Sequence, residues 1–283
     1  MKLGNMISTI ILLSMLYIPT LRADSIMTQN KLIYSEVGKG QPLILLHAFP
    51  ADQNLWLPQQ EGLKNHFRVI TLDLRGFGQS GATDGQAVTM EEYADQVKQL
   101  MDQLNIKKAI IGGESMGGYV TLAFLKKYPE LTEGLILSNT QSIPDTTEQQ
   151  YKREATAAFV LTHGSTKLID DFLPKALSPM VAKQIRADLK TMLEAQPATS
   201  IASALRGMSK RDDTTHILKV TKQRVLIITS DQDVVVSPQQ SQFMHECTLN
   251  SRLVMINNAA HLSNLEQPLV WNKAVLDMFS NKH

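Results

Sequence analysis

The sequence of 283 residues has one cysteine, a formal charge of only +1 and no run of acidic or basic residues long enough to form a tail. Because Cys247 stands alone, no disulfide can form within the chain, and no cysteines and histidines have the spacing of a zinc site. The balanced charge provides no basic face for nucleic acid. We therefore expect a globular protein without a disulfide framework, a metal site or a nucleic-acid partner.

One uncharged, mostly apolar run lies at the N-terminus, at residues 6–18. Lys2 precedes it and small residues ending at Ser25 follow it, which is the layout of a secretory signal peptide. The run is short for a bilayer span. We expect residues 1–25 to be a signal peptide, the protein to be exported to a periplasm or medium, and no stable membrane span after processing. Two alternatives are an uncleaved anchor and a true start at Met27, which would give a cytoplasmic protein.

The chain after this segment alternates short apolar runs with helical patterns. Buried runs such as 42–47 are typical of central strands in a parallel sheet. Alternating strands and helices predict a doubly wound α/β fold with its site at the carboxyl ends of the strands. Strands are predicted at residues 31–37, 42–47, 67–72, 108–111, 134–138, 224–229 and 252–256, and helices at 54–63, 90–104 and 119–128.

Residues 140–220 break this alternation, since they contain helical patterns and no convincing strand. The buried-strand pattern resumes at Arg224, so an insertion is the economical explanation. We expect a core of residues 26–139 and 221–283, with 140–220 as a helical cap that forms walls of a substrate pocket. The large apolar residues of this cap are expected mostly in its own core, with some facing substrate: Phe159, Leu161, Phe172, Leu173, Met180 and Met208.

The motif Gly113-Glu114-Ser115-Met116-Gly117 ends an expected strand, and a helical pattern follows it. A serine hydroxyl is a weak nucleophile, so it must be lifted from the backbone, given a general base and placed beside donors for an oxyanion. A sharp strand-to-helix turn does this, and it leaves no room for side chains at Gly113 and Gly117. Ser115 is therefore the predicted nucleophile.

Two later loops offer a base and an acid for Ser115. Asp231 and Asp233 follow one expected strand and His261 follows the next, each just past the carboxyl end. Carboxyl ends of parallel strands meet at one edge of a sheet, so these groups are expected beside the serine. His261 would accept the proton from Ser115, and an aspartate would orient the imidazole. Position alone does not decide between Asp231 and Asp233.

With these residues assembled, the sequence resembles the α/β-hydrolase superfamily, in particular its capped esterase, lactonase and perhydrolase-like members. The resemblance extends over about residues 31–279. The motifs that carry it, in the family's order, are Leu46-His47-Ala48-Phe49-Pro50, Asp73-Leu74-Arg75-Gly76-Phe77-Gly78-Gln79-Ser80, Gly113-Glu114-Ser115-Met116-Gly117-Gly118, Asp231-Gln232-Asp233 and Ala260-His261-Leu262-Ser263-Asn264-Leu265-Glu266-Gln267-Pro268.

The resemblance implies a mostly parallel, eight-stranded sheet with an inserted helical cap. It implies that Ser115 is the nucleophile, that His261 is the base, and that Asp233, the later aspartate of the D-x-D run, is the acid. It also implies that the backbone N–H groups of Phe49 and Met116 are the oxyanion donors. No cofactor and no metal are implied.

Several positions depart from the family's pattern. Ala48, Ser230 and Ala260 stand where glycine is common, and a side chain there would matter if the backbone needed positive φ. His47 resembles a structural residue of its loop. Ser115 replaces the aspartate nucleophile of some relatives, which makes epoxide hydrolysis and dehalogenation poor candidates.

These observations favour a cofactor-independent serine hydrolase that acts on a small or medium carboxylic ester, thioester or lactone. A perhydrolase or carbon–carbon hydrolase with the same triad, and a non-catalytic relative that binds a small ligand, remain alternatives. Aliphatic and aromatic residues outnumber obvious cationic groups in 140–220, so we expect a preference for apolar substrates. A charged substrate would instead require a cationic clamp, for which the candidates are Arg153, Lys175, Arg206 and Arg211. The oligomeric state is not predicted.

Overall fold

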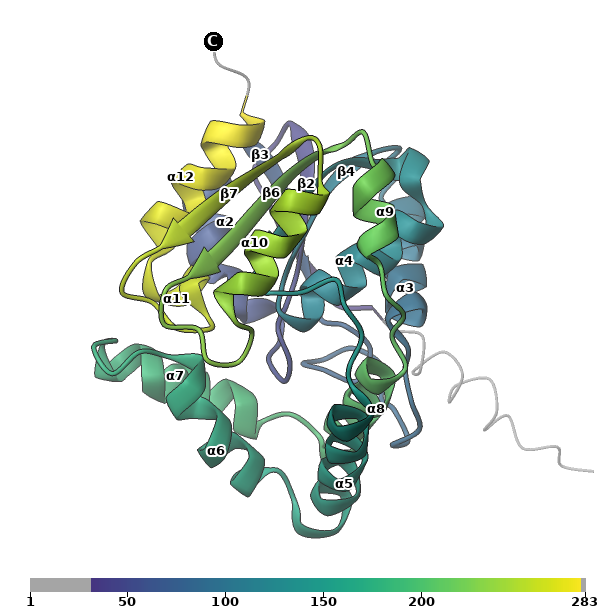
Figure 1. The fold of residues 1–283 in the computed structure, drawn as a ribbon, viewed down its shortest axis with the longest axis vertical. Coiled ribbons are helices and arrows are strands. Elements are labelled where there is room, and N and C mark those ends of the chain that lie inside the picture. The colour runs from purple at the N-terminus through teal and green to yellow at the C-terminus, as the bar shows by residue number, and fades with distance from the viewer. Residues whose placement is uncertain (1–31, 281–283) are drawn as a thin grey trace, which may run out of the picture.

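The computed structural model describes residues 32–280 of the chain (Figure 1). The predicted signal peptide and the alternative start at Met27 lie outside the described residues. Within residues 32–280, no helix is both long and apolar enough to cross a membrane.

A single sheet in the order β1-β3-β2-β4-β5-β6-β7 forms the centre of the fold. Only β1 runs antiparallel to its neighbour, β3, and the other neighbouring pairs are parallel. The described part of the chain thus forms seven strands where eight were expected, and the exposed edge strand β1 ends the sheet on one side. The strands are β1 (Tyr34–Val37), β2 (Gln41–Leu46), β3 (Phe67–Leu72), β4 (Ala109–Glu114), β5 (Thr132–Ser138), β6 (Arg224–Ser230) and β7 (Ser251–Ile256).

Helices cover both faces of this sheet because successive residues of each buried strand point to opposite sides. On β2, Ile44 and Leu46 pack toward α3 and α4, whereas Leu43 and Leu45 pack toward α2 and α12. The helices α9 and α10 complete the first face through Leu218 and Met244. The bounds are α2 (Leu57–Leu63), α3 (Met90–Gln103), α4 (Met116–Lys127), α9 (Thr215–Val220), α10 (Pro238–Cys247) and α12 (Pro268–Phe279), with short turns at η1 (Gln53–Trp56), η2 (Pro129–Leu131) and α11 (Ser263–Glu266).

Four further helices follow β5 and lie beyond the carboxyl ends of the strands, at the bottom of Figure 1. We call them the cap helices: α5 (Thr147–His163), α6 (Thr166–Ala176), α7 (Lys183–Glu194) and α8 (Ala198–Ser209). They form two pairs, α5 beside α8 and α6 beside α7. Helix α5 begins with a capping box, in which Thr146 and Gln149 satisfy each other's backbone N–H groups.

Two observations bear on the expected insertion. Helix α9 falls within 140–220, yet its Leu218 packs with the helices of the sheet, so the division into core and cap at these residues stays a prediction. The apolar cap residues also divide differently from the expectation. Leu173 and Met208 are buried, but Phe159, Leu161 and Met180 are 39%, 40% and 89% exposed. Phe159 and Leu161 lie on α5, and Met180 lies in the loop between α6 and α7.

Candidate active site

Ser115 lies at the turn between β4 and α4, with φ of 54° and ψ of −112°. A non-glycine residue rarely adopts positive φ, and such strain clusters at functional sites. The flanking glycines make the turn possible. A Cβ on Gly113 would lie 2.0 Å from the carbonyl carbon of Gly117, and a Cβ on Gly117 would lie 2.0 Å from the Leu46 oxygen. The turn at Ser115 thus has the sharp strand-to-helix geometry that a nucleophile elbow requires, and the role of Ser115 as nucleophile stays a prediction.

The structure brings Ser115, His261 and Asp233 together in one chain of hydrogen bonds. His261 Nε2 is 2.8 Å from Ser115 Oγ, and His261 Nδ1 is 2.9 Å from Asp233 Oδ2. His261 is fully buried, whereas 9% of Ser115 remains exposed. A buried imidazole with a carboxylate on one side and a serine hydroxyl on the other is arranged for proton transfer from that hydroxyl.

Asp233 is held as a carboxylate by several donors. Its Oδ1 accepts the backbone N–H groups of Val235 (2.8 Å) and Val236 (2.9 Å), and its Oδ2 accepts Asn139 Nδ2 at 3.0 Å as well as His261. Burial, the largest influence, acts to raise the pKa of Asp233. The charge and hydrogen bond of His261, helped by the other donors, outweigh it and lower this pKa below its usual value. Asp233 is therefore an anion at neutral pH.

Asp231, the alternative acid, is placed elsewhere. Its backbone N–H donates to the Ile256 carbonyl (3.1 Å), and its Oδ1 accepts the N–H of Ala259 at 3.3 Å. The His261 imidazole bonds to Asp233 instead. The geometry thus separates two aspartates that the sequence spacing left equivalent, and Asp231 shapes the loop.

Asn139 and Ser230 support the acid and were not anticipated from the sequence. Asn139 adopts φ of 46° at the end of β5 and donates to both Ser230 Oγ (2.6 Å) and Asp233. The Ser230 hydroxyl donates to the Ala260 carbonyl at 2.5 Å. The only feature of the sequence that could have indicated this role is that Asn139 is a polar residue directly after the strand β5. The Ser230 hydroxyl thus makes a hydrogen bond that a glycine at this position could not make. Ala48, Ser230 and Ala260 are not among the described residues with positive φ, so their backbone does not require glycine.

The loop after β2 lies beside the serine. Phe49 lines the same pocket as Ser115, and Met116 is the first residue of α4, where no earlier helical turn accepts its N–H. His47 is buried, with Nδ1 2.9 Å from the Ala48 carbonyl and Nε2 accepting the Leu74 N–H at 3.0 Å. Burial lowers the pKa of His47 against the opposing effect of the Ala48 carbonyl. With both ring nitrogens bonded to backbone, His47 serves the loop structure.

Glu266 joins the histidine loop to the cap. Its carboxylate accepts the backbone N–H of Ala260 at 2.8 Å and that of Ser178, just after α6, at 3.0 and 3.1 Å. The Ser178 hydroxyl also donates to Glu266, and the Leu262 N–H donates to the Ala176 carbonyl at 2.9 Å. Of the two neighbours of the candidate base, Leu262 is thus bonded directly to the segment after α6, and Ala260 is connected to it through Glu266.

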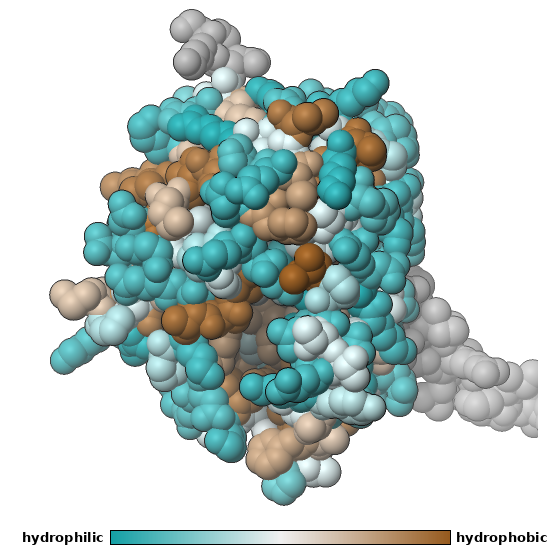
Figure 2. Space-filling model, viewed as in Figure 1, coloured by the Kyte–Doolittle hydropathy of each residue, from teal (hydrophilic) through white to brown (hydrophobic). Residues whose placement is uncertain are grey.

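A pocket of about 310 Å³ opens at Ser115 between the two pairs of cap helices, and Figure 2 shows a hollow in this region of the surface. One wall is apolar and includes Phe172, whose ring meets that of His261 edge-on with centroids 6.2 Å apart. Phe159, expected to share this role, lies outside the pocket and stacks on His163. The apolar lining consists of Phe49, Tyr119, Leu168, Phe172, Leu205, Met208, Val235 and Val236, and the polar lining of Ser115, Gln141, Asp145, Gln149, Lys152, Arg153, Thr156 and His261.

Comparison with known proteins adds family evidence to this geometry. A family model described as "alpha/beta hydrolase fold" matches residues 41–268. The chain belongs to the α/β-hydrolase fold family. The resemblance inferred from the motifs is thereby confirmed, and with it the expectation of a hydrolase with this fold.

The chain is similar to three proteins of this kind, one named as an esterase and two named as enol-lactonases. A malate-bound thermophilic esterase from Thermogutta terrifontis is 32% identical, with a TM-score of 0.84 over 87% of this chain and 92% of that chain. The enol-lactonase from Burkholderia xenovorans LB400 is 27% identical, with a TM-score of 0.80 over 87% and 95%. The 3-oxoadipate enol-lactonase 1 of Acinetobacter baylyi is 28% identical over 80% of this chain and 84% of its own length.

Only one of the four cations considered from the sequence of this α/β-hydrolase lines the pocket. Arg153 does so, and Arg211 lies behind it, bonded to the same aspartate, Asp145. Arg206 turns away from the pocket and forms an ion pair with Glu154. Lys152, which was not considered, lines the pocket in place of Lys175. Helix α5 is polar over most of its length, so no pattern marks its pocket-facing side in the sequence.

Proposed function

We propose that the protein is a serine hydrolase that cleaves a small or medium carboxylic ester, thioester or lactone through an acyl-enzyme. The observation that carries this proposal is the hydrogen-bonded chain from Ser115 through His261 to Asp233 at the floor of the pocket. Similarity to proteins named as an esterase and as enol-lactonases supports the same class of bond. The pocket volume suits a small substrate.

The first half of the reaction forms the acyl-enzyme. Ser115 Oγ attacks the carbonyl carbon while its proton passes to His261 Nε2. Negative charge that collects on the carbonyl oxygen is stabilised by the backbone N–H groups of Phe49 and Met116. The resulting imidazolium, stabilised by Asp233, gives its proton to the leaving alcohol oxygen as the carbon–oxygen bond breaks. In a lactone the leaving oxygen stays tethered to the acyl group.

The second half of the reaction releases the acid. His261 takes a proton from a water molecule, whose oxygen attacks the acyl carbon through the same oxyanion. The proton returns to Ser115 Oγ as the ester bond to the serine breaks. Each proton removed is returned, so the enzyme regains its starting state. The strained turn holds Ser115 Oγ at the pocket floor throughout both steps.

Labelling with a fluorophosphonate probe tests this mechanism, because the probe reacts with serines that a base activates. We expect intact-protein mass to rise by one probe and peptide mapping to find the adduct on Ser115. The heat-unfolded protein, which lacks the hydrogen bond to His261, should stay unlabelled. The Ser115→Ala variant should fold, take up no probe and lose ester turnover by several powers of ten. Unchanged turnover by this variant would refute the proposal.

A further inference from the structure

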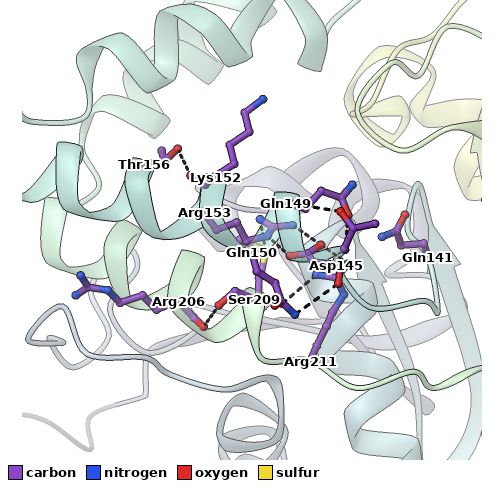
Figure 3. Close-up of polar contacts among 12 residues, drawn as sticks. Gln141, Asp145, Gln149, Gln150, Lys152, Arg153, Thr156, Arg206, Ser209 and Arg211 are labelled. Carbon is purple, nitrogen blue, oxygen red and sulfur yellow. Dashed lines mark hydrogen bonds and ion pairs between the residues drawn. The ribbon is translucent and has the colours of Figure 1, made fainter.

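One wall of the pocket carries charged and polar side chains from a single helix. Gln149, Lys152, Arg153 and Thr156 recur on α5 at the spacing of one helical face, and all four line the pocket. Asp145, from the loop before α5, completes what we call the α5 wall. Figure 3 shows these side chains, with Lys152 directed away from the cluster at Asp145.

Asp145 is shared by two arginines (Figure 3). Arg153 Nε donates to Asp145 Oδ2, and Arg153 Nη2 reaches Oδ1 at 3.3 Å. Arg211 Nη2 lies 2.7 Å from the same Oδ1. Only 2% of the Asp145 side chain is exposed, so the carboxylate is enclosed by the two guanidinium groups. One negative charge therefore faces two positive charges.

Both terminal nitrogens of Arg211 are bonded to protein groups. Its Nη1 donates to the Met208 carbonyl at 3.0 Å, its Nη2 reaches the Ile143 carbonyl at 3.3 Å, and its guanidinium lies 4.1 Å from the ring centroid of Tyr119. It does not line the pocket at Ser115. Arg211 is thus the partner that neutralises Asp145 from behind, which leaves the charge of Arg153 uncompensated.

Arg153 and Lys152 each have nitrogen donors without a strong hydrogen-bond acceptor in the described part of the protein. Arg153 Nη1 has only the Met208 sulfur at 3.5 Å, and a thioether is a weak acceptor. Within residues 32–280, the Lys152 ammonium has no hydrogen bond or ion pair. A guanidinium with an open edge in a half-enclosed pocket favours an anionic ligand, which it can bind with charge-assisted hydrogen bonds.

We infer that the α5 wall binds a free carboxylate carried by the substrate, so that the preferred substrate is an ester or lactone with a second, unesterified carboxyl group. This inference rests on the proposed function and names the substrate class of that site. It replaces the sequence-based expectation of an apolar substrate, because the pocket has a charged side on α5 as well as an apolar side on α6. Leu168 and Phe172 there would contact the carbon chain between the two ends of the substrate.

The charge of the wall favours a carboxylate over a phosphate. Asp145 stands next to the open edge of Arg153 and would repel a dianion more strongly than a monoanion. Arg153 already uses Nε and Nη2 on Asp145, so one guanidinium nitrogen remains for the ligand, and Lys152 adds a second positive charge elsewhere on the same wall. A flat group with one charge matches this donor set.

Paired substrates of equal length test the inference. Monoethyl succinate, glutarate and adipate are compared with ethyl butanoate, pentanoate and hexanoate, which replace the free carboxylate by a methyl group. Hydrolysis is followed by pH-stat at neutral pH and low salt. We expect kcat/KM at the best length to favour the half-ester by about tenfold, the effect of one hydrogen bond to a charged group. Added salt should reduce this preference.

Two arginine variants assign the preference to the α5 wall. Arg153→Gln should lower the ratio of the two kcat/KM values by about tenfold. Arg206→Gln is the matched control: it removes an arginine that pairs with Glu154 outside the pocket, so the ratio should stay at the wild-type value. Should Arg153→Gln fail to fold, Lys152→Gln removes an exposed cation and should lower the ratio by about threefold.

The outcomes separate the inference from the function on which it rests. A wild-type ratio near one, or the same ratio in Arg153→Gln and Arg206→Gln, would overturn the inference while ester hydrolysis stands. If neither ester is hydrolysed and the fluorophosphonate probe leaves Ser115 unlabelled, the proposed function fails. Binding of monoethyl glutarate to the Ser115→Ala variant, measured by calorimetry, then still tests the wall. In the Ser115→Ala background, the inference predicts that Arg153→Gln weakens this binding about tenfold. Equal affinities after Arg153→Gln and after Arg206→Gln would refute it.

Discussion

Two polar clusters face the same pocket, and they differ in how fully the protein satisfies them. At the ends of the strands, Asp233 accepts four hydrogen bonds from protein groups and His261 is bonded on both sides. On α5, Arg153 has one well-satisfied side and one open edge, and Lys152 has no partner within residues 32–280. Side chains whose hydrogen bonds are all made within the protein are held in one position, whereas donors without a protein acceptor can bind a ligand.

The origin of each cluster explains this difference. Ser115, Asp233 and His261 follow three parallel strands, so the hydrogen bonds of the sheet determine their relative positions. The α5 wall depends on one helix and the loop before it. No strand of the sheet contributes to the α5 wall within residues 32–280. We expect substitutions in the first cluster to affect turnover on every substrate, and those in the second to affect the choice between substrates.

The largest effect is expected for the acid. Asp233→Asn should lower kcat about ten-thousandfold, because an amide favours the wrong tautomer of His261 and cannot stabilise the imidazolium. Asp231→Asn is the matched control and should retain most activity, since Asp231 contacts the Ala259 backbone and not the imidazole. Turnover of one ester by the two purified variants measures this. A greater loss in Asp231→Asn would show that the acid is misassigned.

A smaller effect is expected from the apolar wall. Phe172→Ala should move the optimum to longer acyl chains and change kcat/KM by about tenfold, since one methylene in a pocket contributes roughly 1–3 kcal/mol. Phe159→Ala removes the same ring from the outer side of α5, where it is 39% exposed, and should leave the optimum unchanged. A panel of straight-chain esters provides the measurement. Equal profiles for the two variants would exclude Phe172 from substrate contact.

The smallest effect concerns Glu114, a fully buried carboxyl next to the nucleophile. Burial, helped by the nearby Asp233 carboxylate and opposed by the Ser138 hydroxyl, raises the pKa of Glu114 well above its usual value. The folded protein keeps this proton while the unfolded chain releases it above the ordinary pKa. The stability contributed by the protonated form is therefore present at low pH and falls as pH rises.

Glu114→Gln removes this dependence. The gain in melting temperature over the wild type should increase from about pH 5 to about pH 8, across the range where the unfolded side chain is ionised. Glu133→Gln, at an exposed position of β5, is the control and should show no such increase. Thermal unfolding followed by circular dichroism at each pH is sufficient. A constant difference between Glu114→Gln and the wild type would contradict the raised pKa.

The meeting of Ser115, Asp233 and His261 could be predicted from the sequence because its signals are local. Apolar runs marked the strands, and polar residues just past them marked the carboxyl edge that the structure assembles. The choice between Asp231 and Asp233 needed the family resemblance, since both follow β6 within three residues. Asn139 was missed because a single polar residue after β5 has no distinguishing spacing.

The α5 wall could not be predicted in this way. Helix α5 is polar on its solvent face as well as on its pocket face, so its pattern does not reveal which side meets the substrate. Asp145 lies in a loop without periodicity, and its two arginines are separated from each other by 58 positions, 153 to 211. Their meeting depends on how α8 packs against α5, which is tertiary information.

The carboxylate of Glu266 has a consequence for engineering and for divergence among relatives. Because it holds both Ala260, beside His261, and Ser178, in the cap, the cap is not an exchangeable module that ends cleanly at its two junctions with the sheet. A chimera that takes its cap from another family member must also supply a backbone N–H at the position of Ser178. Without it, the half-buried Glu266 carboxylate loses a donor while it still holds Ala260, the residue before the candidate base.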